Sequence, residues 1–350
     1  MQRGHVAPIS TLALAVTLAI GAVLIAPEAR AATTALAAHH HSSDGWTFAV
    51  IGDVPYGEPA QVRFPAFIAG INADPDVRMV THLGDIKSGS TTCDDQRLST
   101  IRADFARFDD PLVYTPGDNE WTDCHRANNG GYHPLERLAR VRSLFFARPG
   151  TTLGASVPVT SQARDGIPEN VRYVRAGLSF ATLHVVGSNN DLAPWTGLGE
   201  SAPTTDQVAE ERHRMAVSIA NVRAAFHVAR RHQLRGVVLQ QQADMFDPTV
   251  PDPTFADFSA FKPLVQVIVD ESRRFHGPVY LFNGDSHRFN QDRPLAAGSK
   301  WLGFYGVKHS ADDLRRVTVD GSDLGEADWL KVTVRPHGKE LLGFEQVPGA

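Results

Sequence analysis

The sequence predicts an α/β fold in one large domain that is built around parallel strands. From Trp46 onward, short apolar runs alternate with segments whose hydrophobic residues recur at helical spacing, a pattern typical of parallel βαβ units. Several apolar runs end in Gly-Asp, which suits a sharp turn after a strand. The length of 350 residues fits one large domain or two small ones, but no repeat or low-complexity linker follows residue 45.

The first part of the domain alternates strictly between strand and helix. Apolar runs predict strands, and helical spacing of hydrophobic residues, such as Phe67, Ile68 and Ile71 in the first helix, predicts the segments between them. Strands are expected at 47–52, 79–83 and 112–114, and helices at 60–72, 98–108 and 135–146.

The second part is less regular and contains two expected hairpins. Ala176-Gly177 and His337-Gly338 each separate two apolar runs, as hairpin turns do. Strands are expected at 171–174, 179–186, 236–240, 279–282, 328–334 and 340–344, and helices at 206–232 and 255–275.

The N-terminal segment has the features of a secretory signal peptide. Arg3 precedes a run of apolar and small residues at 11–25, and Ala29-Arg30-Ala31 places small residues at the two positions that signal peptidase recognises. An uncleaved membrane anchor is the alternative, although the apolar run is shorter than the roughly 20 residues of a spanning helix. We expect export, with residues 1–31 removed, 32–45 as a linker, and no membrane span in the mature chain.

Charge and cysteine content agree with an exported enzyme or binding protein. The net charge of −5 gives no general affinity for nucleic acid or anionic lipid. Cys93 and Cys124 are the two cysteines, and an oxidising compartment allows them to close as a disulfide. Two unrelated buried thiols are the alternative. The bridge is favoured because both cysteines follow strand ends that we expect to lie side by side.

Four expected strands finish with the same dipeptide, Gly-Asp. Ligands bind outside the carboxyl ends of the strands in an open parallel sheet, so side chains at these ends are expected to meet in one crevice. A single Gly-Asp pair is explained equally well as a turn, but four pairs at strand ends favour a shared site. The four carboxylates belong to Asp53, Asp85, Asp118 and Asp285.

Carboxylates that meet in this way need a cation between them. Unpaired like charges repel, and some of the groups would have to take up protons. Oxygen ligands suit Mg²⁺, Mn²⁺ or Ca²⁺. His287, two residues after Asp285, adds an imidazole and extends the candidates to Zn²⁺ and iron. The sequence therefore predicts a site for one or two divalent metal ions.

The order and spacing of these motifs resemble those of the calcineurin-like metallophosphoesterases. That family carries D-x-H, G-D-x-x-x-x-G, G-N-H-[D/E], a His on a later strand and G-H-x-H. In this sequence the matching segments are Gly52-Asp53, Gly84-Asp85, Gly117-Asp118-Asn119-Glu120, the strand 237–240 with Gln241, and Gly284-Asp285-Ser286-His287. The resemblance covers most of the chain from residue 46 to 287.

This resemblance implies a fold, an activity and a set of ligands. The implied fold is a four-layer α/β/β/α sandwich with mixed sheets. The implied activity is that of a secreted phosphoesterase that hydrolyses small phosphate mono- or diesters with metal-activated water, and Asp85 is implied to bridge two metals. The implied metal ligands are Asp53, Asp85, Asp118, Gln241, Asp285 and His287.

Several positions depart from the family pattern. Pro55 stands where the family has a metal-binding His, and the nearby Tyr56 is a candidate to compensate for it. Oxygen ligands replace imidazoles at Gln241 and Asp285, and Asp118 replaces an Asn. These changes favour the harder ions Mg²⁺, Mn²⁺ and Ca²⁺ over Zn²⁺ and iron.

The catalytic positions also depart from the pattern. Asn119 replaces the catalytic His and cannot donate a proton as an acid, although it can hydrogen-bond a phosphoryl oxygen. His125 is the candidate acid, with an exposed polar loop residue as the alternative interpretation. The lost histidines keep a second class of function open, in which a catalytically degenerate protein retains the fold and binds a metal or another ligand.

Overall fold

The computed structural model of the protein describes Met1 and residues 45–322, 328–338 and 340–349. The predicted signal peptide at 1–31 and linker at 32–45 lie outside the described residues, apart from Met1 and Gly45. In the part of the chain that is described, no helix combines the length and the apolar character needed to cross a membrane.

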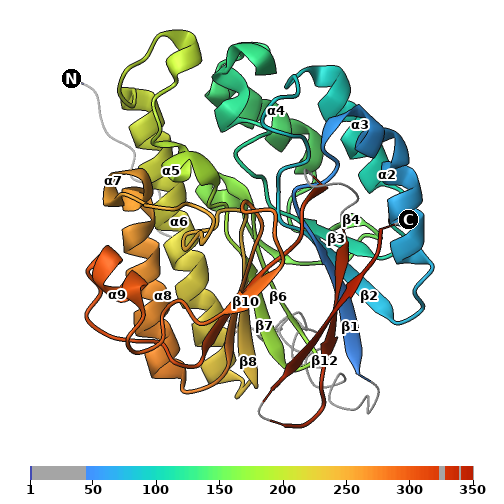
Figure 1. The fold of residues 1–350 in the computed structure, drawn as a ribbon, viewed down its shortest axis with the longest axis vertical. Helices are drawn as coiled ribbons and strands as arrows, with labels where there is room; N and C mark the ends of the chain where they lie inside the picture. Colours follow the sequence, from blue (N-terminus) through green and yellow to red (C-terminus); the bar gives the residue numbers. More distant parts are fainter. Residues whose placement is uncertain (2–44, 323–327, 339, 350) are drawn as a thin grey trace. The chain divides into compact units, whose positions relative to one another are not determined.

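The first sheet is mixed and has six strands (Figure 1). Its strands are β1 Trp46–Ile51, β2 Val77–His82, β3 Pro111–Tyr114, β4 Leu153–Gly154, β12 Trp329–Val334 and β13 Leu342–Val347. They lie in the order β13-β12-β1-β2-β3-β4. The strands β1, β2 and β3 are parallel, while β4, β12 and β13 pair antiparallel with their neighbours.

The second sheet is also mixed and has seven strands. Its strands are β5 Thr160–Gln162, β6 Ile167–Arg175, β7 Leu178–Thr182, β8 Gly236–Gln240, β9 Val279–Asn283, β10 Asn290–Asp292 and β11 Leu314–Thr318. They lie in the order β10-β11-β9-β8-β7-β6-β5. The central strands β7, β8, β9 and β11 are parallel, and the outer ones are antiparallel.

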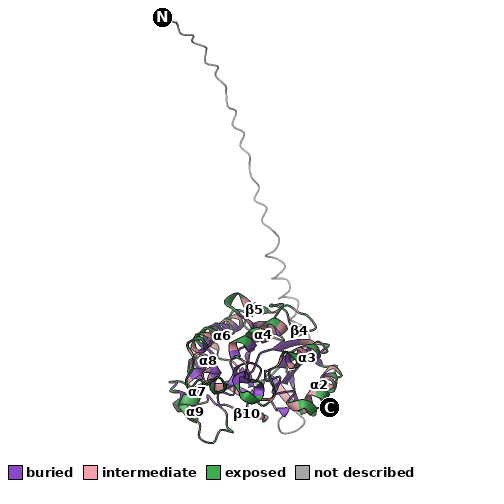
Figure 2. Cartoon of the chain, turned by 90° about the horizontal axis from the view of Figure 1, so that it is seen from above, coloured by how far each residue is buried: buried purple, intermediate pink, exposed green. Residues whose placement is uncertain are grey.

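Helices cover the outer face of each sheet. The first sheet packs against α2 Gly57–Asn72, α3 Asp95–Phe105 and α4 Pro134–Phe145. The second packs against α6 Thr205–Arg231, α7 Phe255–Phe258, α8 Lys262–Phe275 and α9 Lys300–Tyr305. The helices turn buried sides inward and exposed sides to solvent (Figure 2).

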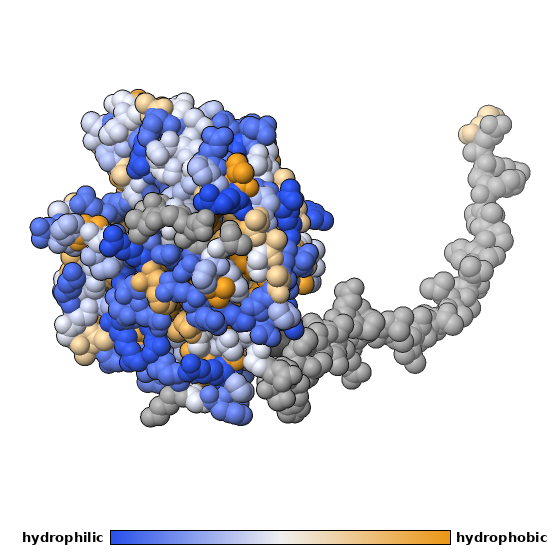
Figure 3. Space-filling view, turned by 45° about the vertical axis from the view of Figure 1, so that its right-hand side comes forward, coloured by the Kyte–Doolittle hydropathy of each residue, from blue (hydrophilic) through white to orange (hydrophobic). Residues whose placement is uncertain are grey.

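Alternation along the strands creates the layers. In β1, Ala49 and Ile51 join the core beneath α2 to α4, while Phe48 and Val50 point the other way. The side chains of Phe48 and Val50 meet those of the second sheet, among them Phe180. The molecule is therefore an α/β sandwich of two mixed sheets packed face to face, and the predicted α/β class is confirmed. One face of its surface is mainly polar with scattered hydrophobic groups (Figure 3).

Most expected elements are present, and the differences have physical causes. The expected strand 179–186 ends at Thr182, because the chain leaves the sheet for an irregular turn. The expected helix 255–275 is interrupted by a 3₁₀ turn at Ser259–Phe261. Pro263 explains the restart, since proline fits the first turn of a helix but not its interior. The strands β10 and β11 and the helix α9 were not expected.

The predicted disulfide between Cys93 and Cys124 is present, with a Cα–Cα distance of 5.7 Å. It connects the loop that follows β2 to the 3₁₀ turn Thr122–His125, which follows β3. The bond therefore ties together the loops of two Gly-Asp motifs, and it is compatible with an oxidising compartment.

Removal of this disulfide should lower stability without changing the fold. The bridge closes a loop with a sequence separation of 31 residues, so a Cys93→Ala/Cys124→Ala variant should lose about 3 to 4 kcal/mol of unfolding free energy. Urea unfolding monitored by circular dichroism measures the loss. A change below about 1 kcal/mol would show that the loops are held by packing alone.

Candidate metal centre

The four Gly-Asp carboxylates come from both sheets and lie at the carboxyl ends of parallel strands. Asp53 follows β1, Asp85 follows β2 and Asp118 follows β3, all in the first sheet. Asp285 follows β9 in the second sheet. The two sheets pack face to face, so these strand ends converge on one place.

Five predicted ligands form two adjoining groups that share one carboxylate. Asp53, Asp85 and His287 make the first group, and Asp85, Asp118 and Asp285 make the second. Within each group the ligand atoms lie within 4.8 Å of one another. Asp53, Asp85 and Asp118 are buried, whereas Asp285 and His287 are partly exposed. The arrangement can hold two neighbouring cations with Asp85 between them.

The backbone is strained at four of these five residues. Asp53, Asp85, Asp285 and His287 have φ values of 55°, 58°, 72° and 58°. This left-handed region is uncommon for residues other than glycine, and strain of this kind collects at functional sites. The left-handed conformation follows directly on a strand end and turns each side chain into the crevice.

The glycines of the motifs make room for carboxylates from neighbouring strands. A Cβ atom at Gly117 would overlap the carboxylate of Asp85, and one at Gly284 would overlap that of Asp53. At these two positions, the Gly of one motif therefore leaves space for the Asp of another.

Neutral donors orient the shared carboxylate. The backbone amide of Asn119 donates to Asp85 Oδ1 at 3.1 Å, and its side-chain amide donates to Oδ2 at 2.9 Å. Glu120 holds the same loop, because its Oε1 accepts from the Gly117 amide at 2.7 Å and from the Tyr114 hydroxyl at 2.6 Å. Asn119, the predicted substitute for a catalytic His, therefore lies directly at the site.

The hydroxyl of Tyr56 lies among the ligands of the first group. It is 3.3 Å from Asp53 Oδ1, 3.0 Å from Asp85 Oδ2 and 3.3 Å from His287 Nε2. Its oxygen also accepts a hydrogen bond from Asn119 Nδ2 at 2.9 Å. A phenol has one proton and can donate it to only one of these three atoms.

Burial and mutual repulsion raise the pKa values of two carboxyls in the second group. Burial, followed by the charges of Asp118, Glu120, Asp53 and Asp285, raises the pKa of Asp85 well above its usual value. Burial, Asp118 and Asp53 do the same to the pKa of Asp285. A cation held between such carboxyls would favour their charged forms, and four carboxylates, one imidazole and one phenol are donors that can coordinate a divalent ion.

The amide that contacts the carboxylates belongs to Gln242, and Gln241 points elsewhere. Gln242 Nε2 donates to Asp85 Oδ2 and Asp118 Oδ1, each at 3.1 Å. Gln241 Nε2 donates instead to the Ala243 carbonyl at 2.8 Å, and its Oε1 is buried without a hydrogen bond. The structure thus places Gln242, just beyond the end of β8, against the carboxylates, while the predicted ligand Gln241 bonds the Ala243 carbonyl instead.

His125, the predicted acid, lies in the 3₁₀ turn after Asp118 and makes a structural contact. Its Nδ1 accepts a hydrogen bond from the Gly197 amide at 3.1 Å. Burial and the charge of Arg126 lower its pKa. His125 belongs to neither of the two ligand groups, so the geometry does not bring it to the carboxylates.

Two cations lie near the cluster. Lys87 is fully buried and donates to the Ser88 carbonyl at 2.9 Å, and burial lowers its pKa to about 8. Arg126 is partly exposed and pairs with Asp123 at 2.7 Å. In the ion pairs formed within the described ranges, no lysine or arginine bonds the four Gly-Asp carboxylates directly. A basic side chain does contact one of these carboxylates, because His287 Nε2 lies 3.3 Å from Asp53 Oδ1.

An open cleft of about 630 Å³ reaches the partly exposed side of the site. It gives a ligand access to both groups, because one residue of each lies in its wall. It is lined by Pro248, Thr249, Asp285, Ser286, His287, Arg288, Phe289 and Asn290.

Comparisons with known proteins do not assign the chain to a family. No family model and no curated protein matches the sequence. Among solved structures, the chain is similar to one described as "GAP50 the anchor in the inner membrane complex of Plasmodium", with a TM-score of 0.43 and 9% sequence identity, over 87% of this chain and 89% of that one.

The cluster should make the metal-free protein less stable as the pH rises. Asp85 and Asp285 hold protons in the folded chain that they release on unfolding, because their folded pKa values are raised. Stability is therefore lost as the pH increases through those values, by about 1.4 kcal/mol per pH unit for each proton released.

The slope is best measured between about pH 6.5 and 8. Below this range the titration of His82, whose pKa is lowered to about 4, changes stability in the opposite direction, and above it the titration of Lys87, whose pKa is lowered to about 8, does the same. Denaturant unfolding in chelator across this range measures the slope. Saturating Mn²⁺ should flatten it, and Asp85→Asn should reduce it in chelator. A stability that rises with pH in chelator contradicts the assignment.

The two neighbouring glutamines provide a matched pair of variants. Gln242→Leu removes a donor to two carboxylates and should weaken metal binding roughly 10- to 100-fold. Gln241→Leu should leave metal affinity close to that of the wild type, since Gln241 does not contact the carboxylates. Isothermal titration of the stripped protein with Mn²⁺ compares them. The opposite order of affinities would restore Gln241 as the ligand.

Proposed function

We propose that the protein is a metal-dependent phosphoesterase that hydrolyses phosphate mono- or diesters. The observation that supports this most is the pair of ligand groups sharing Asp85, an arrangement suited to two divalent ions a few ångströms apart. The motifs that form it are the ones that resemble calcineurin-like metallophosphoesterases, and the two face-to-face sheets with outer helices agree with the implied four-layer sandwich.

In this proposal Asp53, Asp85 and His287 hold one ion, and Asp85, Asp118 and Asp285 hold the other. Tyr56 supplies a further oxygen to the first group. The donor set favours Mn²⁺, Mg²⁺ or Ca²⁺, while His287 also permits Zn²⁺ or iron. When bound, such ions polarise a phosphoryl oxygen and lower the pKa of a water molecule.

The protein's own residues orient the ligands and receive the substrate. Asn119 and Gln242 fix the position of Asp85 through neutral hydrogen bonds, so they do not compete with it for positive charge. The cleft beside His287 admits the phosphoester, and the guanidinium of Arg288 in its wall can neutralise a phosphate oxygen. No imidazole corresponds to the family's catalytic His, so this chain relies on charge stabilisation more than on acid catalysis.

We also propose that the enzyme acts outside the cytoplasm after removal of residues 1–31. The apolar run and the Ala29-Arg30-Ala31 sequence support export. The disulfide between Cys93 and Cys124 is stable in such a compartment.

The enzymatic proposal predicts metal-dependent turnover that requires Asp85. Mature protein, stripped with chelator, should hydrolyse p-nitrophenyl phosphate or its bis-ester when Mn²⁺ or Mg²⁺ is returned. Asp85→Asn should reduce kcat/KM by more than about 100-fold, because it removes the ligand common to both groups.

Asp109→Asn is the matched control, because Asp109 is exposed and outside the cluster. It should keep full activity. Absence of turnover with every divalent ion and both esters would overturn the proposal, and elemental analysis would then show whether the chain still binds metal.

A non-catalytic metal- or ligand-binding protein is the second candidate, and the position of Tyr56 favours it. The Tyr56 hydroxyl lies between Asp53, Asp85 and His287, where it hinders a substrate oxygen from reaching an ion in the first group. Metal uptake without turnover would support this candidate. Turnover that increases in Tyr56→Phe would instead show that the phenol only limits an active site.

A further inference from the structure

A left-handed turn lies beside the proposed metal site. The segment α5 Gly187–Asp191 has four successive residues with positive φ: Ser188 at 50°, Asn189 at 53°, Asn190 at 54° and Asp191 at 70°. A left-handed helical conformation costs roughly 1–2 kcal/mol per L-residue, and such residues normally occur singly. Four in succession require strong compensating contacts.

One side of α6 provides these contacts at the end of the turn. Gln207 Nε2 donates to the Asp191 carbonyl and to the Ala193 carbonyl, the latter at 2.7 Å. Glu211 accepts a hydrogen bond from Asn190 Nδ2 at 3.0 Å. Gln207 and Glu211 are four residues apart and therefore lie on one face of the helix.

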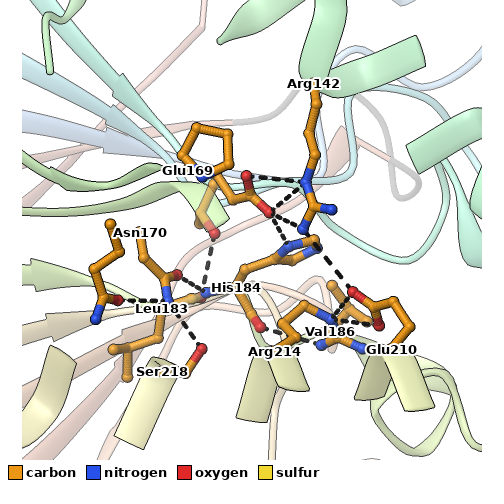
Figure 4. A network of polar contacts seen from close by, with 12 residues as sticks. Arg142, Glu169, Asn170, Leu183, His184, Val186, Glu210, Arg214 and Ser218 are labelled. Carbon is orange, nitrogen blue, oxygen red and sulfur yellow. Dashed lines mark hydrogen bonds and ion pairs between the residues drawn. The ribbon is translucent and has the colours of Figure 1, made fainter. Parts of the chain in front are cut away.

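Arg214 lies on the same face of α6 and also hydrogen-bonds the turn. Its side chain is fully buried. It donates to the His184 carbonyl at 3.1 Å and pairs with Glu210 at 3.0 Å (Figure 4). It donates as well to the Asn190 carbonyl at 3.0 Å. It also hydrogen-bonds the Asn190 side chain.

Buried contacts also fix the chain just before the turn. The backbone amide of His184 donates to Asn170 Oδ1 at 2.7 Å, and its imidazole bonds Glu169 at 2.7 Å. Arg142 in turn bonds Glu169, also at 2.7 Å (Figure 4). The segment is thus held from both ends by side chains that do not touch the metal site.

The inner side of the turn meets the second ligand group. A Cβ atom at Gly187 would collide with the carboxylate of Asp118 and come within 3.0 Å of that of Asp285. The Gly187 amide donates to Gln242 Oε1 at 2.7 Å. Ser188 Oγ lies 3.0 Å from Asp118 Oδ2 and 2.9 Å from Asp123 Oδ1.

We propose that Ser188 is a positioning residue for the ion held by Asp85, Asp118 and Asp285, and that α6 maintains the strained turn for this purpose. Gln242 donates to Oδ1 of Asp118, and the Ser188 hydroxyl lies within hydrogen-bond distance of Oδ2 of Asp118 and Oδ1 of Asp123, one of which accepts its single proton. Both donors are neutral, so each oxygen keeps a lone pair for the metal. Hydrogen bonds that orient a metal ligand in this way typically contribute 10- to 100-fold to metal affinity.

This inference rests on the proposed metal site but adds a residue that no family motif contains. Backbone architecture alone would not require a hydroxyl at position 188, since Asn, Asp or Gly adopts this conformation more readily than Ser. A serine at φ 50°, with its Oγ on two carboxylates, points to a role for the hydroxyl.

Ser188→Gly tests the contribution of the hydroxyl separately from that of the left-handed backbone. Glycine accepts the left-handed conformation without strain, so thermal stability should be unchanged or higher. Asp118→Asn identifies the second ion site, because it changes one of the ligands of that site. In Ser188→Gly the Mn²⁺ affinity of the same site should fall at least about tenfold. Ser143→Ala, an exposed serine on α4, is the control and should bind as the wild type does.

Electron paramagnetic resonance of the Mn²⁺-loaded full-length mature chain provides a second readout. A coupled two-ion spectrum in the wild type should become a single-ion spectrum in Ser188→Gly at equal metal concentration. Arg214→Lys should show the same change together with a lower Tm, because the ammonium group of lysine cannot replace the several hydrogen bonds that the Arg214 guanidinium donates.

The outcomes distinguish the inference from the proposed function. If the wild type binds Mn²⁺ and Asp118→Asn weakens it while Ser188→Gly does not, the positioning role is overturned and the metal site stands. If the wild-type chain binds no divalent ion, the proposed function fails and the inference fails with it. A loss of affinity in Ser188→Gly that comes with unfolding would assign the residue to the fold alone.

Discussion

The constraint on which the structure depends is the burial of four carboxylates in one small space. Asp53, Asp85 and Asp118 are almost inaccessible to water, and Asp285 lies against them. Isolated charges in such surroundings are costly, yet among the described residues the hydrogen bonds to the Asp85 carboxylate come from neutral amides and one phenol. Neutral donors orient carboxylates without neutralising them. The surrounding structure is thus organised to keep negative charge available for a cation.

The fold serves this constraint by bringing strand ends together from two sheets. Each Asp follows a strand, and Asp53, Asp85 and Asp285 adopt a left-handed conformation, while Gly117 and Gly284 leave space for the carboxylates of Asp85 and Asp53. The disulfide links the loops of two motifs. The left-handed turn at Gly187–Asp191 lies beside the same carboxylates. The strain in these segments is offset by contacts further out, such as those of Arg214.

The sequence was sufficient for features with local causes. Apolar periodicity located most strands and helices, Gly-Asp at strand ends located four of the ligands that lie together, and His287, two residues after the last of them, is the fifth. The sequence was insufficient where the direction of a side chain mattered. Whether Gln241 or Gln242 contacts the carboxylates depends on how the end of β8 is oriented toward the first sheet. The turn at 187–191 was missed, although the run GSNND is rich in residues that tolerate positive φ. The strands β10 and β11 carry too few residues in a clear pattern to be recognised.

The position of Tyr56 bears on the proposed metal site. Pro55, just before it, stands where the motif that this sequence resembles has a metal-binding His. The phenol of Tyr56 contacts the carboxylates of Asp53 and Asp85 as well as His287. The same hydroxyl therefore bears on both proposals, because it adds an oxygen to the first ligand group and also limits the space beside that group. A donor set rich in oxygen favours hard cations.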